Sequence, residues 1–210
     1  MLDNTSFAVF LAAAFVLAVT PGPGIFYVLA RSLAGGWREG ALSSVGTFIG
    51  GFVHVVAAAA GISAVLAASA VAFAVVKYAG AAYLVYLGIR MVMTRNVAPV
   101  ADGAGESGGN SVWQGVWTEV LNPKTAIFFL AFIPQFVSPA RGHVFVQFVV
   151  LGTTSVVLNT MADLTVAMFA GAISDRLRAN PRLQVRQRVA SGVGMIGLGV
   201  FVGCSGSSRP

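Results

Sequence analysis

The sequence contains few charged residues: Lys, Arg, Asp and Glu together make up 10% of its 210 positions. A soluble domain normally carries about a quarter charged residues, because its surface must face water. Hydrophobic residues make up 57% of the chain, and the mean hydropathy is +0.83. The scarcity of charge therefore excludes a soluble catalytic domain and predicts helices that lie in lipid.

Thiol and imidazole groups are equally scarce, with one cysteine, Cys204, and two histidines. A single cysteine excludes a disulfide within the chain. So few ligands also argue against a thiolate or imidazole metal site, although a site of carboxylates and carbonyls stays open. The sequence has no Walker loop, no His-Glu-x-x-His motif and no nucleophile elbow. We therefore expect neither an enzyme nor a bound cofactor, and no metal site.

The chain consists mainly of apolar stretches long enough to cross a membrane as helices. Six spans are predicted, at residues 7–31, 40–66, 70–93, 112–136, 144–173 and 189–204. Residues 94–111, TRNVAPVADGAGESGGNS, form a polar linker without apolar periodicity. The predicted fold is an all-α integral membrane protein with one membrane domain, in which the cytoplasmic linker at 94–111 separates a first three-helix repeat (1–93) from a second (112–210).

Positive charges lie mainly on one side of these spans. The loops after the first, third and fifth spans hold Arg31, Arg38, Arg90, Arg95, Arg176, Arg178, Arg182, Arg186 and Arg188, whereas the opposite side holds Arg141 and Arg209. Cytoplasmic loops carry the excess of Lys and Arg, so both termini are predicted to lie outside. No aromatic residues are interleaved with the last five loop arginines, so the net charge of +6 indicates a membrane loop and no nucleic-acid partner.

Two short segments in corresponding positions of the two halves resemble each other. Residues 18–30 read AVTPGPGIFYVLA and residues 120–132 read VLNPKTAIFFLAF, with Pro, Ile and Phe identical when Pro21 is aligned with Pro123. Because each half has three spans, the second half must enter the membrane from the opposite side. The sequence therefore predicts two inverted repeats with broken first and fourth helices.

Both segments also have the pattern of a helix start inside an apolar span. Thr20 and Asn122 are favoured N-cap residues, and the proline after each is favoured at the first helical position. A helix start exposes unpaired N–H groups and the positive end of the helix dipole, which suits a substrate carboxylate. The alternative is that the prolines only kink two helices for packing. The expected substrate-binding residues in the two breaks are Thr20, Pro21, Gly22, Pro23, Gly24, Tyr27, Asn122, Pro123 and Lys124.

Charged side chains at membrane depth are costly, so they are candidates for function. Asp163, within NTMADLTVAMF, is predicted to bind a substrate ammonium or to accept a proton, and a structural hydrogen bond is the alternative. Glu119 and His54 are further candidates for proton coupling. The alternatives are an interfacial position for Glu119 and a packing role for His54.

The segments TPGPGIFYVLARSLAGGWREG and LNPKTAIFFLAFIPQFV closely resemble LysE-type amino-acid exporters, in particular the RhtB branch that exports homoserine, threonine and similar amino acids. The resemblance covers most of the chain and is weaker in the last third. It implies a multi-pass efflux carrier of the bacterial inner membrane, driven by proton antiport, and leaves a homodimer open. The motif positions of the family correspond to Pro21, Gly22, Pro23, Gly24, Asn122, Pro123 and Lys124.

The sequence therefore predicts a secondary-active exporter of amino acids related to homoserine, threonine or leucine, with both termini periplasmic. Its partners would be the amino acid, protons and membrane lipid. Three alternatives stay open: export of another small solute or ion, a membrane scaffold that transports nothing, and an intramembrane hydrolase that pairs His54 with Ser43, Ser44 or Ser63.

Overall fold

The computed structural model describes residues 4–68, 70–93, 110–173 and 180–204. Regular structure within these ranges is entirely helical, which confirms the all-α prediction. In chain order the elements are α1 (Asn4–Val19), α2 (Pro23–Ala68), α3 (Ala70–Met93), α4 (Ser111–Val120), α5 (Pro123–Ile127), the π-helical turn η1 (Phe128–Phe132), the 3-10 turns η2 (Ile133–Phe136) and η3 (Pro139–Arg141), α6 (Val144–Met168) and α8 (Pro181–Cys204).

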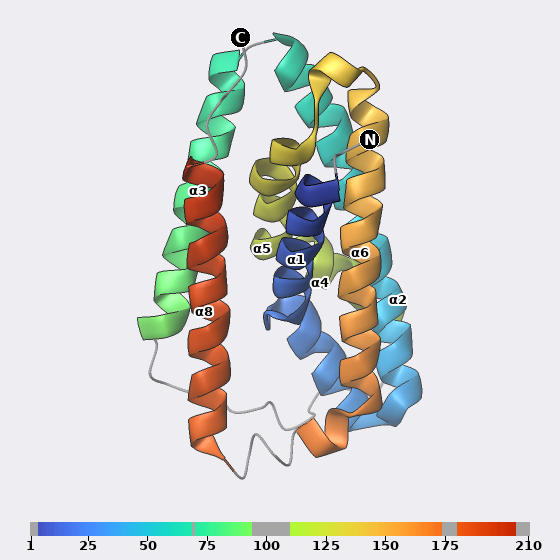
Figure 1. The fold of residues 1–210 in the computed structure, drawn as a ribbon. Coiled ribbons are helices and arrows are strands. Elements are labelled where there is room, and N and C mark those ends of the chain that lie inside the picture. Colours follow the sequence, from blue (N-terminus) through green and yellow to red (C-terminus); the bar gives the residue numbers. More distant parts are fainter. Residues whose placement is uncertain (1–3, 69, 94–109, 174–179, 205–210) are drawn as a thin grey trace.

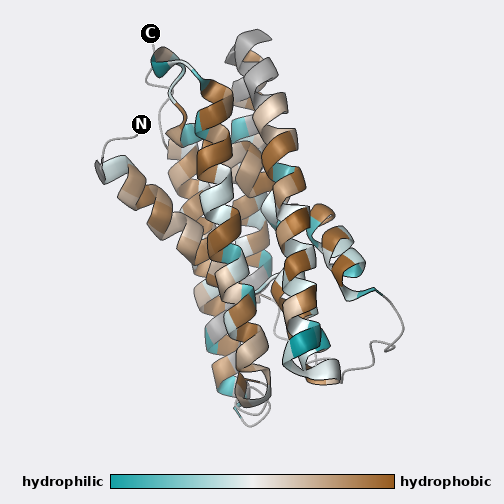
Figure 2. Cartoon of the chain, turned by 90° about the vertical axis from the view of Figure 1, so that its right-hand side faces the viewer, coloured by the Kyte–Doolittle hydropathy of each residue, from teal (hydrophilic) through white to brown (hydrophobic). Residues whose placement is uncertain are grey.

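The helices form an elongated bundle, with the starts of α1 and α6 and the end of α8 towards its upper end in Figure 1. Helix α2 packs against α4 and α6, α1 packs against α6, and α3 pairs with α8. Hydrophobic residues run along most of the length of the helices (Figure 2). Many large apolar side chains are exposed on the outside, among them Val56 at 50% and Met161 at 60%. Such a surface suits lipid contact.

Two helices are long and apolar enough to cross a membrane, Pro23–Gly61 and Val144–Met168. The pair Ser111–Val120 and Pro123–Phe136, bent by 47°, can form a third span. Thr5–Val19 and Val189–Cys204 are shorter apolar helices. By length and composition, the described residues thus provide two or three spans, and the arrangement of six helices in two inverted repeats stays a prediction.

The loop predicted between the first two spans is reduced to a short break within α2. Gly36 has φ 74° and ψ −173°, a conformation that favours glycine, and it interrupts the helical backbone. The chain reverses direction there, at the lower end of the bundle (Figure 1), so that Arg31 and Glu39 come within 2.6 Å of each other. The predicted loop is therefore a tight turn between the two helical segments of α2 that precede and follow Gly36.

The structure also corrects the loop before the last span. Helix α8 begins at Pro181, eight residues before the predicted span, so Arg182 and Arg186 lie in helix and not in a loop. Hydropathy located the apolar part of this helix but not its polar first turns, in which arginine and glutamine are good helix formers. Arg176 and Arg178 lie outside the described residues, as does the predicted linker apart from Asn110 and Ser111.

Close contact between α2 and α4 depends on glycine. A Cβ atom added to Gly46 would lie 2.1 Å from the carbonyl oxygen of Val112, and one added to Gly50 would lie 2.6 Å from that of Val116. Small residues of this kind let two membrane helices approach closely. The approach brings the polar face of α2 against the helix that precedes the second break.

Candidate functional site

The first break separates α1, which ends at Val19, from α2, which begins at Pro23. The Gly22 carbonyl accepts the first helical hydrogen bond of α2, from the Phe26 N–H at 3.0 Å. Gly22 is therefore the N-cap and Pro23 occupies the first helical position. The prediction of Thr20 as N-cap is wrong, because its hydroxyl donates to the Val16 carbonyl at 2.6 Å and so belongs to the last turn of α1.

The second break has the predicted local structure. Helix α4 ends at Val120, and Asn122 caps α5 by accepting a hydrogen bond from the Lys124 N–H at 3.1 Å. Pro123 follows at the start of the helix. Thr125, whose hydroxyl is close to Glu119, lies in the same short helix. The capping pattern in the sequence thus located this helix start correctly.

Lys124 joins the two breaks. Its ammonium donates hydrogen bonds to the Leu17 carbonyl at 3.1 Å and to the Thr20 carbonyl at 2.9 Å. These carbonyls lie at the end of α1, where the helix dipole is negative and favours a cation. The Lys124 side chain is buried, and its carbon chain passes close to Gly22, where an added Cβ would approach it to 3.2 Å. Residues from the two halves of the chain therefore meet in one buried site.

Glu119 places a buried carboxylate beside both breaks. It is 2% exposed and accepts hydrogen bonds from the Thr125 hydroxyl at 2.6 Å and from the Asn122 amide at 3.0 Å. A Cβ added to Gly24 would lie 2.7 Å from a Glu119 oxygen, so only glycine fits there without displacing the carboxylate. The first turn of α2, with its positive dipole end, thus faces a carboxylate.

His54 contacts the backbone of this region. A ring nitrogen, Nε2, lies 2.9 Å from the Glu119 carbonyl oxygen. The Ser43 and Ser44 hydroxyls donate to the carbonyls of Glu39 and Gly40 on their own helix. These contacts hold His54 and the two serines separately, which argues against a hydrolase pair of His54 with Ser43 or Ser44. The side chain of Ser63, the third serine named from the sequence, lies outside the described part of the structure.

Asp163 is fully buried on α6. One carboxylate oxygen accepts a hydrogen bond from the Thr47 hydroxyl at 2.8 Å, and the other has no hydrogen-bond partner among the described residues. An ionised carboxylate with an unpaired oxygen is costly to bury. The arrangement therefore suits a group that takes up a proton or a cation.

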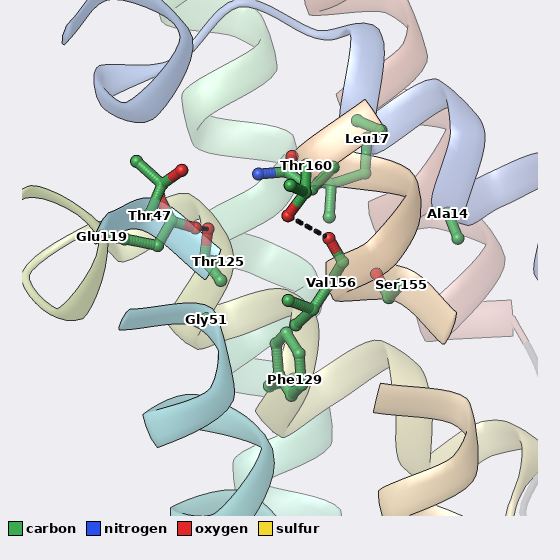
Figure 3. Close-up of a pocket in the computed structure, with 12 residues that line it drawn as sticks. Ala14, Leu17, Thr47, Gly51, Glu119, Thr125, Phe129, Ser155, Val156 and Thr160 are labelled. Atoms are coloured by element: carbon green, nitrogen blue, oxygen red, sulfur yellow. Dashed lines mark hydrogen bonds between the residues drawn. The ribbon is translucent and has the colours of Figure 1, made fainter. Parts of the chain in front are cut away.

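A narrow pocket lies next to the breaks (Figure 3). It has room for little more than one water-sized sphere. Its lining residues come from α1, α2, both sides of the second break and α6: Ala14, Leu17, Ala18, Thr47, Gly51, Glu119, Thr125, Phe129, Ser155, Val156, Asn159 and Thr160. In Figure 3 the Thr125 hydroxyl meets Glu119, and the Thr160 hydroxyl meets the Val156 carbonyl.

The pocket contains one of the acids named from sequence, Glu119, whereas Asp163 reaches it only through Thr47. Sequence reasoning missed the polar residues of α6 at the pocket. Ser155, Asn159 and Asp163 recur every four positions and so share one helix face, a signal that the sequence contained. Pro21, Pro23 and Pro123 are partly or largely exposed and shape the backbone without lining the pocket.

Tyr27 lies in a different cluster, at the lower end of the bundle. Its hydroxyl donates to the Ser111 carbonyl at 2.7 Å. The buried Arg31 pairs with Glu39 at 2.6 Å and also donates to the Ser111 hydroxyl, which in turn contacts Glu39. We call Tyr27, Arg31, Glu39 and Ser111 the lower cluster. It joins the helix that follows the first break to the helix that precedes the second.

Comparison with known proteins gives a match over most of the chain. The sequence profile of the LysE type translocator family matches residues 15–206. An uncharacterized membrane protein of Vibrio cholerae serotype O1 is 31% identical over 202 residues, which is 96% of this chain and 98% of that protein. A leucine efflux protein of Enterobacter sp. (strain 638) is 30% identical over 203 residues, or 94% of this chain and 92% of that protein.

A homoserine/homoserine lactone efflux protein of Salmonella typhi is 26% identical over 188 residues, which is 89% of this chain and 91% of that protein. No solved structure matches the chain. The similarity of sequence thus extends over nearly the full length of relatives that are named for efflux.

Proposed function

Since this chain belongs to the family of LysE type translocators, we propose that it exports neutral amino acids across the bacterial inner membrane. Relatives named for the efflux of leucine and of homoserine support this substrate class. The export would be secondary-active and coupled to protons. Lipid surrounds the protein in this proposal, and a homodimer stays a prediction.

The meeting of the two breaks is the observation that carries the proposal. Lys124 and Glu119 bring one cation and one anion into the protein interior beside a pocket. Each break also offers a helix end with its own partial charge. An amino-acid zwitterion needs both signs of charge at short range, and this site supplies both.

We assign the substrate ammonium to Glu119, because this carboxylate lines the pocket. The substrate carboxylate would turn towards Lys124 and the helix start capped by Asn122. Asp163 would take up the coupling proton, and its hydrogen bond to Thr47 connects it to the pocket wall. In this proposal Glu119 binds the substrate ammonium, Lys124 binds the substrate carboxylate and Asp163 exchanges the proton.

The pairing of helices supports inverted repeats and alternating access. Helix α3, the third span of the first half, packs against α8, the last span of the second half. Phe10 lies one turn of α1 before Ala14 of the pocket, and its buried ring has its centroid 5.5 Å from that of the buried Phe136. At the other end the lower cluster joins the two halves. We propose that these two regions close the pocket in turn.

Efflux from proteoliposomes tests the function. Vesicles that contain the full chain are loaded with a panel of labelled amino acids, and release is followed with and without an inward proton gradient. Release of one or more neutral amino acids that the gradient accelerates is expected. If no amino acid leaves faster than from vesicles without protein, the proposed export is wrong. Release that ignores the gradient would retain export but remove proton coupling.

A further inference from the structure

The pocket has two chemically different walls. Thr47, Glu119 and Thr125 form a polar wall, which Ser155, Asn159 and Thr160 of α6 continue. Helix α1 contributes apolar side chains alone, Ala14, Leu17 and Ala18, which we call the α1 wall. The charges of a zwitterion belong on the polar wall, so the α1 wall is left for the rest of the molecule.

The side chains of the α1 wall offer no hydrogen bonds to a polar substrate side chain. Ala14, Leu17 and Ala18 are at most 4% exposed. The Leu17 carbonyl of this wall already accepts from the Lys124 ammonium and the Thr20 N–H. A polar side chain placed here would lose its hydrogen bonds to water without replacement, which is costly. An aliphatic side chain meets no such cost.

Ala14 and Ala18 place only small methyl side chains on the α1 wall. They lie one helical turn apart, at positions i and i+4, and so present their methyl groups to the same side of α1. Behind the rest of the pocket the packing is tight: an added Cβ at Gly51 would meet Val156 at 3.1 Å, and Phe129 is 2% exposed. Alanine takes up less of the space beside the pocket than Val156 or Phe129, so the α1 wall is the place where the lining is least bulky.

We propose that Ala14 and Ala18 form the subsite for the substrate side chain, and that they select neutral amino acids with short aliphatic side chains. This inference rests on the proposed export of amino acids and adds the residues that set its specificity. The size of the residue at position 18 limits the size of the side chain that is carried.

Two substitutions that change the side-chain volume at position 18 in opposite directions test the subsite. Ala18→Val fills the wall and Ala18→Gly enlarges it. Ala12→Val and Ala12→Gly are matched controls, because Ala12 lies on the exposed face of the same helix. Each variant, as the full chain in proteoliposomes, is tested for efflux of alanine, valine, leucine and phenylalanine. The measured quantity is the ratio of the leucine rate to the alanine rate, which does not depend on the amount of active protein.

Ala18→Val is expected to lower the leucine to alanine ratio by roughly tenfold, the discrimination that one or two methyl groups give in an apolar pocket. Ala18→Gly is expected to raise this ratio and to admit phenylalanine. Both Ala12 controls should keep the wild-type ratio. If Ala18→Val is inactive towards every amino acid, the Ala18→Gly ratio decides.

The proposed subsite is wrong if Ala18→Gly leaves the leucine to alanine ratio unchanged, or if the Ala12 controls change this ratio as much as the Ala18 variants do. Either result would leave the proposed export intact. Absence of efflux of every amino acid by the wild-type protein would instead overturn the proposed function. The two failures are therefore distinguishable in one set of vesicles.

Discussion

Lys124 and Glu119 owe their importance to the environment that surrounds them. Each is costly to bury alone, and each has its hydrogen bonds satisfied by groups at a helix break. Lys124 donates to two carbonyls at the end of α1, and Glu119 accepts from Asn122 and Thr125. The breaks therefore stabilise charges that an unbroken helix could not.

The Asp163 carboxylate is expected to carry the coupling proton. Asp163→Asn keeps the size of the side chain and can still accept from the Thr47 hydroxyl, but it cannot exchange a proton. Membrane insertion should be unchanged, and acceleration of efflux by a proton gradient should be lost completely. Proteoliposome efflux with and without the gradient measures this effect.

Glu119→Gln is the matched comparison for Asp163→Asn, since it neutralises the other buried acid. It is expected to lower efflux both with and without the gradient, because the ammonium of the substrate loses the Glu119 carboxylate that binds it. Gradient-dependent efflux that survives in Asp163→Asn but disappears in Glu119→Gln would assign the coupling proton to Glu119.

Helices meet closely in this molecule where glycine removes the side chain, and α2 against α4 is the clearest case. In Gly46→Ala the new methyl group would meet the Val112 carbonyl at 2.1 Å, so the helices must separate. We expect this overpacking to destabilise the protein by about 1–3 kcal/mol. The midpoint of thermal unfolding in detergent measures the change.

Gly61→Ala is the control for Gly46→Ala on the same helix. A Cβ at Gly61 meets nothing within 4 Å, and alanine is a better helix former than glycine. Its unfolding midpoint should equal that of the wild type or exceed it slightly. Equal midpoints for the two variants would show that the α2–α4 contact has room to adjust.

The lower cluster provides a second prediction for these elements. Glu39→Gln removes the ion pair with Arg31 and weakens the connection to Ser111, so α2 and α4 should separate more readily at this end. In a Cys204→Ser background, a cysteine at Ser155 reports on the pocket. Glu39→Gln should make it react several-fold faster with a thiol reagent supplied from the linker side.

Arg38→Gln is the matched control for the lower cluster, because it removes a neighbouring, exposed charge without touching Ser111. Its labelling rate should equal that of the parent. Equal rates in Arg38→Gln and Glu39→Gln would mean that the ion pair does not close the pocket.

The charge distribution predicts the orientation of the whole molecule in the membrane, and Cys204 makes this prediction testable. Cys204 is exposed at the end of α8. If both termini are periplasmic, a membrane-impermeant thiol reagent should label Cys204 in cells whose outer membrane alone is permeable. A cysteine at Ser107 of the linker, in a Cys204→Ser background, should react only after the inner membrane is opened. The reverse pattern would invert the predicted topology.

Composition and local motifs were sufficient to predict a lipid environment, the helical class and the positions of both breaks. Composition acts on the whole chain, and caps such as Asn122–Pro123 act over a few residues, so neither requires knowledge of distant contacts. The resemblance to the translocator family also rested on residues near the breaks.

The way in which these parts meet became visible only in the folded structure. It showed that Thr20 closes α1, that the chain turns back at the non-helical Gly36, and that Glu119 lines the pocket while Asp163 reaches it through Thr47. The hydrogen bond from the Lys124 ammonium to the Thr20 carbonyl joins residues 104 positions apart. Local propensity and helical period extend over a few turns, whereas such contacts depend on how whole helices pack, which is why the sequence left them open.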